Sequence, residues 1–441
     1  MEKNSKDGQK HNKKKTGIFL KIFLPMVLLV ILQLIAFLLI SVFSGEFSYV
    51  KDYANDVLIE KTKNRTNYVE SQLQQKTALV SETATEIDSI IADILQEENV
   101  TIDDIATNKE LNNKIIEQTS DNLISLLRRD LVNDAYIILD TKDLYDNDAK
   151  ACMVIRDYDP NNNSINSNSD LLVEVGSSSI ANTFGATLDS EWACNLTIDD
   201  TETFDFYNKT IATARENPDA NLSDLGYWST LSSLSRSTDP SLKYTVPLID
   251  KEGNVYGVVG IGLLAKSIIK NIPSNDFLSE SACYVLCADT NLNGEYSIVL
   301  HSGAIFSRLV DNTETISKHH TASKDNKEIL EFNYSNDVET IGIVKNISLY
   351  NQSSPYYDED WALVCVADKK SVIAIYTMLV KTFVISSLIS AVIGFIIVII
   401  ISKSITKPIY NVIDTLDTNN QYDGIIKFDA TDISEIDRLT T

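Results

Sequence analysis

The sequence predicts an α+β protein that two helices hold in a membrane. Three observations lead to this prediction: two uncharged apolar runs, a long helical repeat after the first run, and short β-branched runs in the middle of the chain. A long N-terminal stalk helix should therefore precede two tandem modules with antiparallel sheets, and a transmembrane helix should lie on either side. The 441 residues are enough for two or three domains.

The two apolar runs cover 22–44 and 382–402, and each has more than 20 residues without a charge. A membrane-spanning helix needs about 20 such residues. A signal peptide has a shorter apolar region and a small-residue cleavage site, and the segment after the first run offers no A-x-A pattern. We therefore expect transmembrane helices at 22–44 and 379–402.

Basic residues precede the first span and follow the second. Residues 1–21 form a basic tail with a net charge of +5, and Lys403 and Lys407 follow the second span. Because loops rich in Lys stay in the cytoplasm, we expect both termini inside and residues of about 45–381 outside the cell membrane.

The outer segment is strongly acidic, with a net charge of −26. The whole chain has −24, because the basic N-terminal tail more than offsets the acidic segment after the second span. Nucleic acid is excluded as a partner, because neutralising phosphates requires Lys and Arg. A well-solvated surface is enough to account for the acidity.

Five cysteines lie in the outer segment, at 152, 194, 283, 287 and 365. An oxidising exterior permits disulfides, and an odd count leaves one thiol free. Without a C-x-x-C pair, nothing predicts zinc, and we expect neither metal nor cofactor. We interpret the cysteines as packing residues and leave a Cys152–Cys194 bridge open.

Helical spacing dominates the chain up to residue 131. Apolar residues three, four or seven apart predict a helix of about 50 residues over 47–97 and a second over 108–131. We assign 45–131 to stalk and sensor helices. The stripe of the first helix comprises Leu73, Val80, Ala84, Ile87, Ile91 and Ile94.

Strand signals then define two modules, at 132–270 and 271–370, which could be structural repeats. The first should contain strands at 135–140, 151–156 and 171–175, a helix at 204–217 and a hairpin over 242–264 that turns at 250–254. The second should contain strands at 283–288, 296–301, 329–334, 339–347 and 361–367.

Two motifs suggest metals but have simpler interpretations. Asp289–Gly294 matches the first half of a calcium loop, but position twelve is Leu300 where a bidentate Glu is needed, and Asn-Gly between apolar runs favours a hairpin. His319 and His320 are adjacent and project in different directions in any regular element. No catalytic grouping appears, so an ectoenzyme is not expected.

The layout over about 45–380 resembles the double Cache sensors of bacterial chemoreceptors, histidine kinases and cyclic-dinucleotide enzymes. The resemblance is carried by Leu225-Gly-Tyr-Trp-Ser229, by Tyr244-Thr-Val-Pro-Leu-Ile249 and by Val255-Tyr-Gly-Val-Val-Gly-Ile261. It implies two PAS-like modules, of which the membrane-distal one (132–270) holds a small-molecule ligand and the membrane-proximal one (271–370) couples to the membrane.

A pocket of this kind needs aromatic walls and a few polar groups. Candidates for the walls are Trp228, Tyr227, Tyr244 and Trp192, and Arg156 could pair with a ligand carboxylate. The alternative is that the aromatic residues belong to the core and that Arg156 lies at a strand edge. The aromatic and charged set of the amino-acid-binding subgroup has no convincing counterpart here, so the ligand stays open.

The segment 403–441 resembles a partial HAMP relay, a parallel four-helix bundle in a homodimer. Ser404–Pro408 is followed by apolar residues at helical spacing, a connector with Gly424, and a second helix that opens with Glu435 and Ile436 and reaches Leu439. We expect a homodimeric signalling receptor, a fragment whose output module (kinase, cyclase, phosphodiesterase or chemoreceptor coiled coil) is absent. The alternatives are a membrane-anchored protein-binding or structural module, and a simple juxtamembrane helix in place of the relay.

Overall fold

The computed structural model describes residues 17–43, 46–142, 149–161, 168–198, 202–234, 239–273, 282–310, 314–317, 321–322, 326–332, 338–419, 428 and 434–440. These residues form two compact units. One combines Met1–Ala54 with Ile373–Thr441, and the other is Asn55–Val372. Each is described by itself below.

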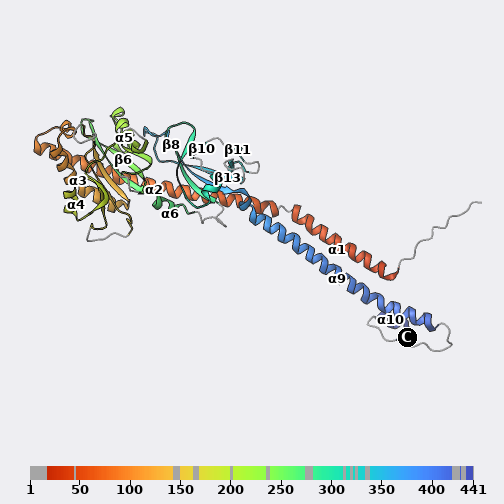
Figure 1. Ribbon diagram of the computed structural model, residues 1–441. Coiled ribbons are helices and arrows are strands. Elements are labelled where there is room, and N and C mark those ends of the chain that lie inside the picture. The colour runs from red at the N-terminus through yellow and green to blue at the C-terminus, as the bar shows by residue number, and fades with distance from the viewer. Residues whose placement is uncertain are drawn as a thin grey trace, which may run out of the picture. The chain divides into compact units, whose positions relative to one another are not determined.

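The first unit is built on two long apolar helices that lie side by side (Figure 1). Helix α1 (Ile18–Phe43) contacts α9 (Ala374–Asn419) through the ring pairs Phe23–Phe395 and Phe37–Phe383. The stretches Ile18–Phe37 and Tyr376–Thr418 are long and apolar enough to cross a membrane. Both predicted spans therefore lie in helices of sufficient length.

The segment interpreted as a relay is helical in the parts that the structure describes. Helix α9 continues through Pro408 to Asn419, and α10 (Ser434–Thr440) follows. Gly424 and its connector lie outside the described residues. The relay itself stays a prediction.

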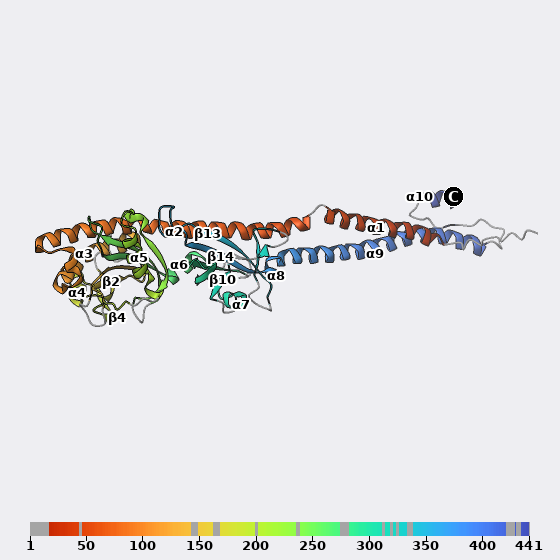
Figure 2. The same ribbon diagram turned by 90° about the horizontal axis from the view of Figure 1, so that it is seen from above.

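The stalk helix is confirmed as α2 (Glu46–Glu98), a single helix of 53 residues. Its predicted stripe is buried, from Leu73 at 2 % exposure to Ile94 at 1 %. These side chains form one core with α3 (Lys109–Asp130) and with one face of each sheet. The helix extends along both sheets of this unit, so both sheets pack on the same helix (Figure 2).

The first sheet has seven strands in the order β4-β3-β2-β1-β7-β6-β5. All neighbours are antiparallel except β3 and β4, which pair in parallel. The predicted strands and the 242–264 hairpin are present, whereas β4 was missed because its exposed sequence TLDSEWA lacks apolar alternation. The strands are β1 (Asp134–Leu139), β2 (Cys152–Arg156), β3 (Leu172–Val175), β4 (Thr187–Ala193), β5 (Tyr227–Ser232), β6 (Ser241–Ile249) and β7 (Val255–Leu264).

The second sheet repeats this topology in the order β10-β9-β8-β14-β13-β12-β11. In each sheet the module's first strand lies between its second strand and its last strand, and the two strands that precede the last one in sequence continue the sheet beyond it. Five strands therefore share one arrangement, in the orders β2-β1-β7-β6-β5 and β9-β8-β14-β13-β12. The two sheets are therefore structural repeats, as the sequence allowed. The strands are β8 (Ala282–Asp289), β9 (Glu295–His301), β10 (Thr315–Ser317), β11 (Thr321–Ala322), β12 (Leu330–Phe332), β13 (Thr340–Ile347) and β14 (Asp360–Asp368).

The first sheet separates two layers of side chains. Ala135 and Ile137 of β1 face the core shared with α2, whereas Tyr136 and Ile138 face a second core that contains Phe206 of α5 (Asp205–Glu216). The alternation follows from the two-residue period of a strand. The shorter helical elements are η1 (Ile102–Ala106), α4 (Ser178–Phe184), η3 (Glu202–Phe204), η4 (Leu222–Asp224), α6 (Ala265–Asn271), α7 (Phe306–Val310) and α8 (Lys369–Val372).

The motif at Asp289–Gly294 is a hairpin turn between β8 and β9, as expected. The Asp289 carboxylate accepts hydrogen bonds from the backbone N–H groups of Asn293 and Gly294, which occupies its acceptors inside the turn. His319 and His320 lie outside the described residues. All five cysteines are free thiols, with Cys194 exposed and the other four buried.

Candidate functional site

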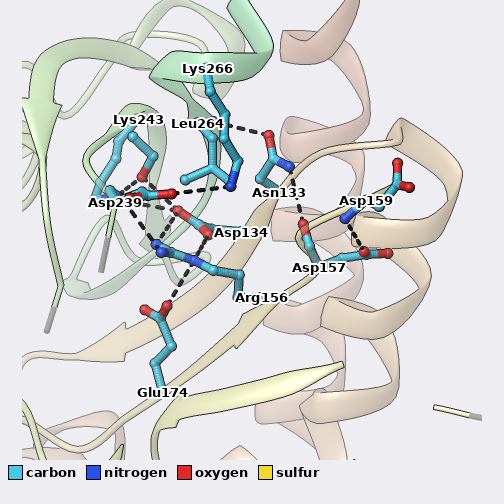
Figure 3. Close-up of polar contacts among 11 residues, drawn as sticks. Asn133, Asp134, Arg156, Asp157, Asp159, Glu174, Asp239, Lys243, Leu264 and Lys266 are labelled. Carbon is cyan, nitrogen blue, oxygen red and sulfur yellow. Dashed lines mark hydrogen bonds and ion pairs between the residues drawn. The ribbon is translucent and has the colours of Figure 1, made fainter. Parts of the chain in front are cut away.

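Four charged side chains are completely buried on the α5 side of the first sheet (Figure 3). They are Asp134 of β1, Arg156 of β2, Glu174 of β3 and Lys243 of β6, and we call them the charge cluster. Arg156 donates from Nε to Asp134 Oδ1 at 2.6 Å and from Nη2 to Oδ2 at 3.1 Å. Such a bidentate pair is the strongest geometry available to a guanidinium and a carboxylate.

Strand register brings the cluster together. Asp134 lies opposite Arg156 on one side and Gly262 of β7 on the other, and Gly262 in turn lies opposite Lys243. A Cβ at position 262 would come within 2.3 Å of Asp134 Oδ2, so glycine leaves the space through which this carboxylate reaches toward β6. There it accepts a hydrogen bond from Ser241 Oγ at 2.6 Å and lies 3.8 Å from Lys243 Nζ.

The next residue on this face of β1 also reaches across a glycine of β7 to β6. Tyr136 lies opposite Gly260, and its hydroxyl crosses this glycine to bond Thr245 Oγ1 at 2.6 Å. The ring of Tyr136 packs edge-on against Phe206 with 5.6 Å between centroids, and Lys243 Nζ lies 5.6 Å from the centre of the Phe206 ring. The charge cluster is thus in contact with the first turn of α5.

Burial and mutual charge set the protonation of the cluster. Burial opposes ionisation of Asp134, but the Arg156 and Lys243 charges outweigh it and hold the pKa of this carboxyl below its usual range. Burial lowers the pKa of Lys243 to about 8, although the Asp134 carboxylate opposes the shift. Burial, together with the Asp134 charge, raises the pKa of Glu174 to about 8.

Glu174 is the member whose hydrogen bonds are incomplete. Its Oε1 lies 2.7 Å from Arg156 Nε, but the single hydrogen on that nitrogen is donated to Asp134. Neither carboxylate oxygen accepts a hydrogen bond from any residue that the structure describes. A buried acceptor without a donor costs about 1–3 kcal/mol, so this position favours an additional donor.

The pKa of Glu174 predicts how its contribution to stability changes with pH. The folded state holds this proton more tightly than the unfolded chain, whose pKa is near 4.5. The free energy of unfolding should therefore fall as pH rises from about 4.5 to about 8, by at most about 1.4 kcal/mol per pH unit. Chemical unfolding of wild type and Glu174→Gln across this range should show the variant with a shallower fall.

Glu328→Gln is the matched control for this prediction. The Glu328 carboxylate is exposed and pairs with Lys345, which lowers its pKa, so its removal should leave the fall unchanged or steepen it slightly. Equal pH slopes for wild type and Glu174→Gln would contradict the assignment.

The five residues that the sequence singled out do not meet at one place. Arg156 lies in the charge cluster, where two carboxylates already surround it. Trp228 and Tyr244 pack with tilted rings, 5.0 Å between centroids, on the opposite face, toward α2. Tyr227 packs on Tyr356 of the second module. Trp192 is partly buried and donates to the Gly176 carbonyl at 2.9 Å.

Several hollows border this module among the described residues, and two of them lie next to residues named above. One of about 620 Å³ lies between α2, Tyr244 and the segment after β13, where Ser348 and Tyr350 line it. The other, of about 320 Å³, is lined by Tyr68 and Lys76 of α2 and by Tyr158 after β2. The ring of Tyr158 lies 5.6 Å from the Arg156 guanidinium, so the second hollow borders the charge cluster.

Asp134, Glu174 and Lys243 were missed by the sequence analysis. Each is a single charge inside an otherwise apolar strand, in the segments DAYIIL, LVEV and SLKYTVPLI. A charge on a strand that is buried on both faces must be paired. That pattern, together with the spaced glycines of β7, is the signal that could have identified them.

The structure is similar to solved sensory domains of bacterial receptors. The periplasmic sensory domain of the Campylobacter jejuni chemoreceptor Tlp1 matches with 15% identity over 72% of this chain and 96% of that chain, at a TM-score of 0.40. The ligand-binding domain of the Pseudomonas aeruginosa amino acid chemoreceptor PctB, in complex with L-Arg, matches with 13% identity over 74% and 92%, at 0.41.

The extracellular domain of the putative histidine kinase soHK1S-Z6 matches with 14% identity over 73% of this chain and 98% of that chain, at a TM-score of 0.34. No protein-family model matches the sequence, and no curated protein matches it. The similar structures are sensory domains of chemoreceptors and of a putative histidine kinase.

Proposed function

We propose that this chain is a transmembrane receptor that senses a small molecule through its first module, the part built on β1–β7. The unit Asn55–Val372 is joined along the chain to an apolar helix at each end, because α2 follows α1 and β14 leads through α8 to α9. Both helices are long enough to span a membrane. A change of packing in the unit can therefore bias membrane helices at both of its ends.

The unsatisfied carboxylate of Glu174 is the observation that carries the ligand assignment. A ligand ammonium would supply the donors that its two oxygens lack, and it would favour the ionised form of a carboxyl that otherwise keeps its proton up to about pH 8. Lys243 has three ammonium hydrogens, one of which is donated to Ser241 Oγ at 2.6 Å, and a ligand carboxylate could accept another. The chemistry that fits both groups is a small zwitterion with an amino group and a carboxylate, such as an amino acid.

Binding calorimetry on the full chain in lipid nanodiscs tests this proposal. The panel contains amino acids, the matching amines without a carboxylate, the matching organic acids without an amine, and nucleobases. We expect heat of binding from at least one zwitterion, a weaker response to its two half-molecules, and loss of binding in Glu174→Gln. Trp192→Phe, on the edge of the same module, should bind as wild type does.

Silence across the panel from a folded protein would overturn direct sensing of such a molecule. Retention of a partner protein from an envelope extract under the same conditions would then favour the alternative, a membrane-anchored protein-binding module. Binding of an amine alone would keep the Glu174 assignment and remove that of Lys243.

The proposal extends to topology and assembly. The basic residues at both termini support a two-pass arrangement with both termini in the cytoplasm and 45–381 outside. The apolar spacing after Pro408 supports a HAMP-like relay in a homodimer, which would pass the signal to an output module.

Cysteine labelling tests this topology. Cys194 is exposed, whereas Cys152, Cys283, Cys287 and Cys365 are buried. A membrane-impermeant maleimide should therefore modify one thiol per chain in intact cells, and Cys194→Ala should abolish the label. Labelling only after the cells are permeabilised would place the unit inside. Absence of a label until a reductant is added would show a Cys152–Cys194 bridge instead.

A further inference from the structure

A short segment between β13 and β14 joins the two modules. We call residues 348–359 the junction segment. Asn351 Nδ2 donates to Asp224 Oδ1 at 2.8 Å, Ser354 Oγ donates to the Asp224 carbonyl at 2.8 Å, and the Trp228 N–H donates to Tyr350 Oη at 3.0 Å. Three residues of the junction segment are thus hydrogen-bonded to the first module, so a movement of that module should move the segment.

Another polar contact of the junction segment reaches α5. Lys209 Nζ lies 2.5 Å from Glu359 Oε1 and also donates to the Thr290 carbonyl at 3.2 Å. Glu359 is only 6 % exposed. The ammonium lies 5.0 Å from the centre of the Tyr227 ring, which packs on Tyr356 at 4.8 Å between centroids. Because the Glu359 side chain is buried, water screens this ion pair less than it screens a pair of exposed side chains.

Helix α5 therefore contacts the charge cluster and the second module at the same time. Phe206, in its first turn, packs on Tyr136 and under Lys243, and Lys209 lies three residues later, one turn along the same surface. A displacement of Phe206 must move Lys209, because both belong to one short rigid helix. The contact of Phe206 with the charge cluster and the contact of Lys209 with Glu359 therefore cannot change independently of one another.

On the other side of the ion pair, the chain leads directly to the membrane helix. Glu359 immediately precedes β14, which lies between β8 and β13 in the second sheet. Strand β14 is followed by α8, and α9 begins two residues after α8 ends.

We propose that α5 is the coupling element of this receptor: it transmits the state of the charge cluster through the Lys209–Glu359 ion pair to β14 and so toward α9. The inference rests on the proposed function, since it names how that site would reach the membrane. A competing route exists through α2, which also contacts both modules and bonds the junction segment where Ser348 N–H donates to Glu70 Oε2 at 3.0 Å.

Hydrogen exchange on the full chain in nanodiscs, without any ligand, separates the two routes. Lys243→Met perturbs the cluster, and the milder Thr245→Val removes the partner of the Tyr136 hydroxyl in case the first variant does not fold. Either change should accelerate exchange of backbone amides in residues 348–372 by about tenfold. In a Lys209→Met background the same change should have no further effect there.

Two controls sharpen the result. Lys209→Arg keeps the charge and should preserve the response, and Lys345→Met, which removes an exposed ion pair with Glu328 on the second sheet, should also preserve it. A full response in the Lys209→Met background would assign coupling to α2 and overturn the proposal. An unchanged rate in every background would overturn it as well, whatever the calorimetry shows about a ligand.

Discussion

Replacing Arg156 with Met should lower the free energy of unfolding of the Asn55–Val372 unit by about 3–5 kcal/mol. The guanidinium is fully buried and is the ion-pair partner of both Asp134 and Glu174. Methionine fills much of the volume but removes the main counter-charge of the buried Asp134 carboxylate. Asp134 must then take up a proton or water must enter, and each alternative destabilises the folded state.

Urea unfolding of the full chain in detergent measures this loss. The three tryptophans, Trp192, Trp228 and Trp361, all lie in this unit, so their fluorescence reports its unfolding. Lys114→Met is the matched control, because Lys114 pairs with Glu97 and Glu98 at the surface, and its loss should leave the midpoint unchanged.

A quadruple variant distinguishes a loss of charge balance from a loss of packing. Arg156→Met combined with Lys243→Met, Asp134→Asn and Glu174→Gln removes every ionisable group of the charge cluster at nearly constant volume. It should recover much of the stability, because the cost arises from unpaired buried charges. A single variant that loses less than about 1 kcal/mol would indicate that water reaches the cluster in the folded protein.

The long elements were predictable because their signals are local. The stripe of α2 repeats over many turns, and the β6–β7 hairpin has apolar strands on both sides of a turn in which Asp250 accepts hydrogen bonds from two backbone N–H groups. Strand β4 gave no such signal, since it is exposed and pairs in parallel at the sheet edge.

The charge cluster could not be predicted in the same way, because it depends on register between distant strands. Asp134 is 22 residues from Arg156 and 107 from Ser241, and only the pairing of β1 with β2 and β7 brings them together. Arg156 was chosen because a guanidinium can pair with a ligand carboxylate, and in the structure it pairs with two carboxyl groups of the protein itself. Its partners required knowledge of which strands are neighbours.

The aromatic candidates show the opposite difficulty. Tyr227 and Trp228 are adjacent in sequence, and therefore face opposite sides of β5. Trp228 packs with Tyr244 in the core toward α2, while Tyr227 packs on the junction segment. By residue type alone, both side chains are equally suitable as pocket walls. Only the fold shows that they cannot line the same wall.

Replacing Trp228 with Ala should therefore reduce stability rather than ligand affinity alone. The side chain is completely buried in the core that the first sheet shares with α2, so its removal leaves a large cavity and should cost about 3–5 kcal/mol. Trp228→Phe keeps most of the packing and also removes Nε1, which has no hydrogen-bond partner among the described residues. It should cost much less than the alanine variant.

Comparing the Trp228 variants with Trp192→Phe distinguishes a structural role of these side chains from contact with a ligand. Trp192 is only partly buried and holds one hydrogen bond to Gly176, so its change should cost about 1 kcal/mol. Urea unfolding and binding calorimetry on the same samples separate the two roles of Trp228. If Trp228→Phe unfolds like wild type but loses binding, Trp228 contacts the ligand. If the alanine variant loses several kcal/mol and the phenylalanine variant binds normally, Trp228 belongs to the core and the ligand is recognised on the other face of the sheet, where the charge cluster lies.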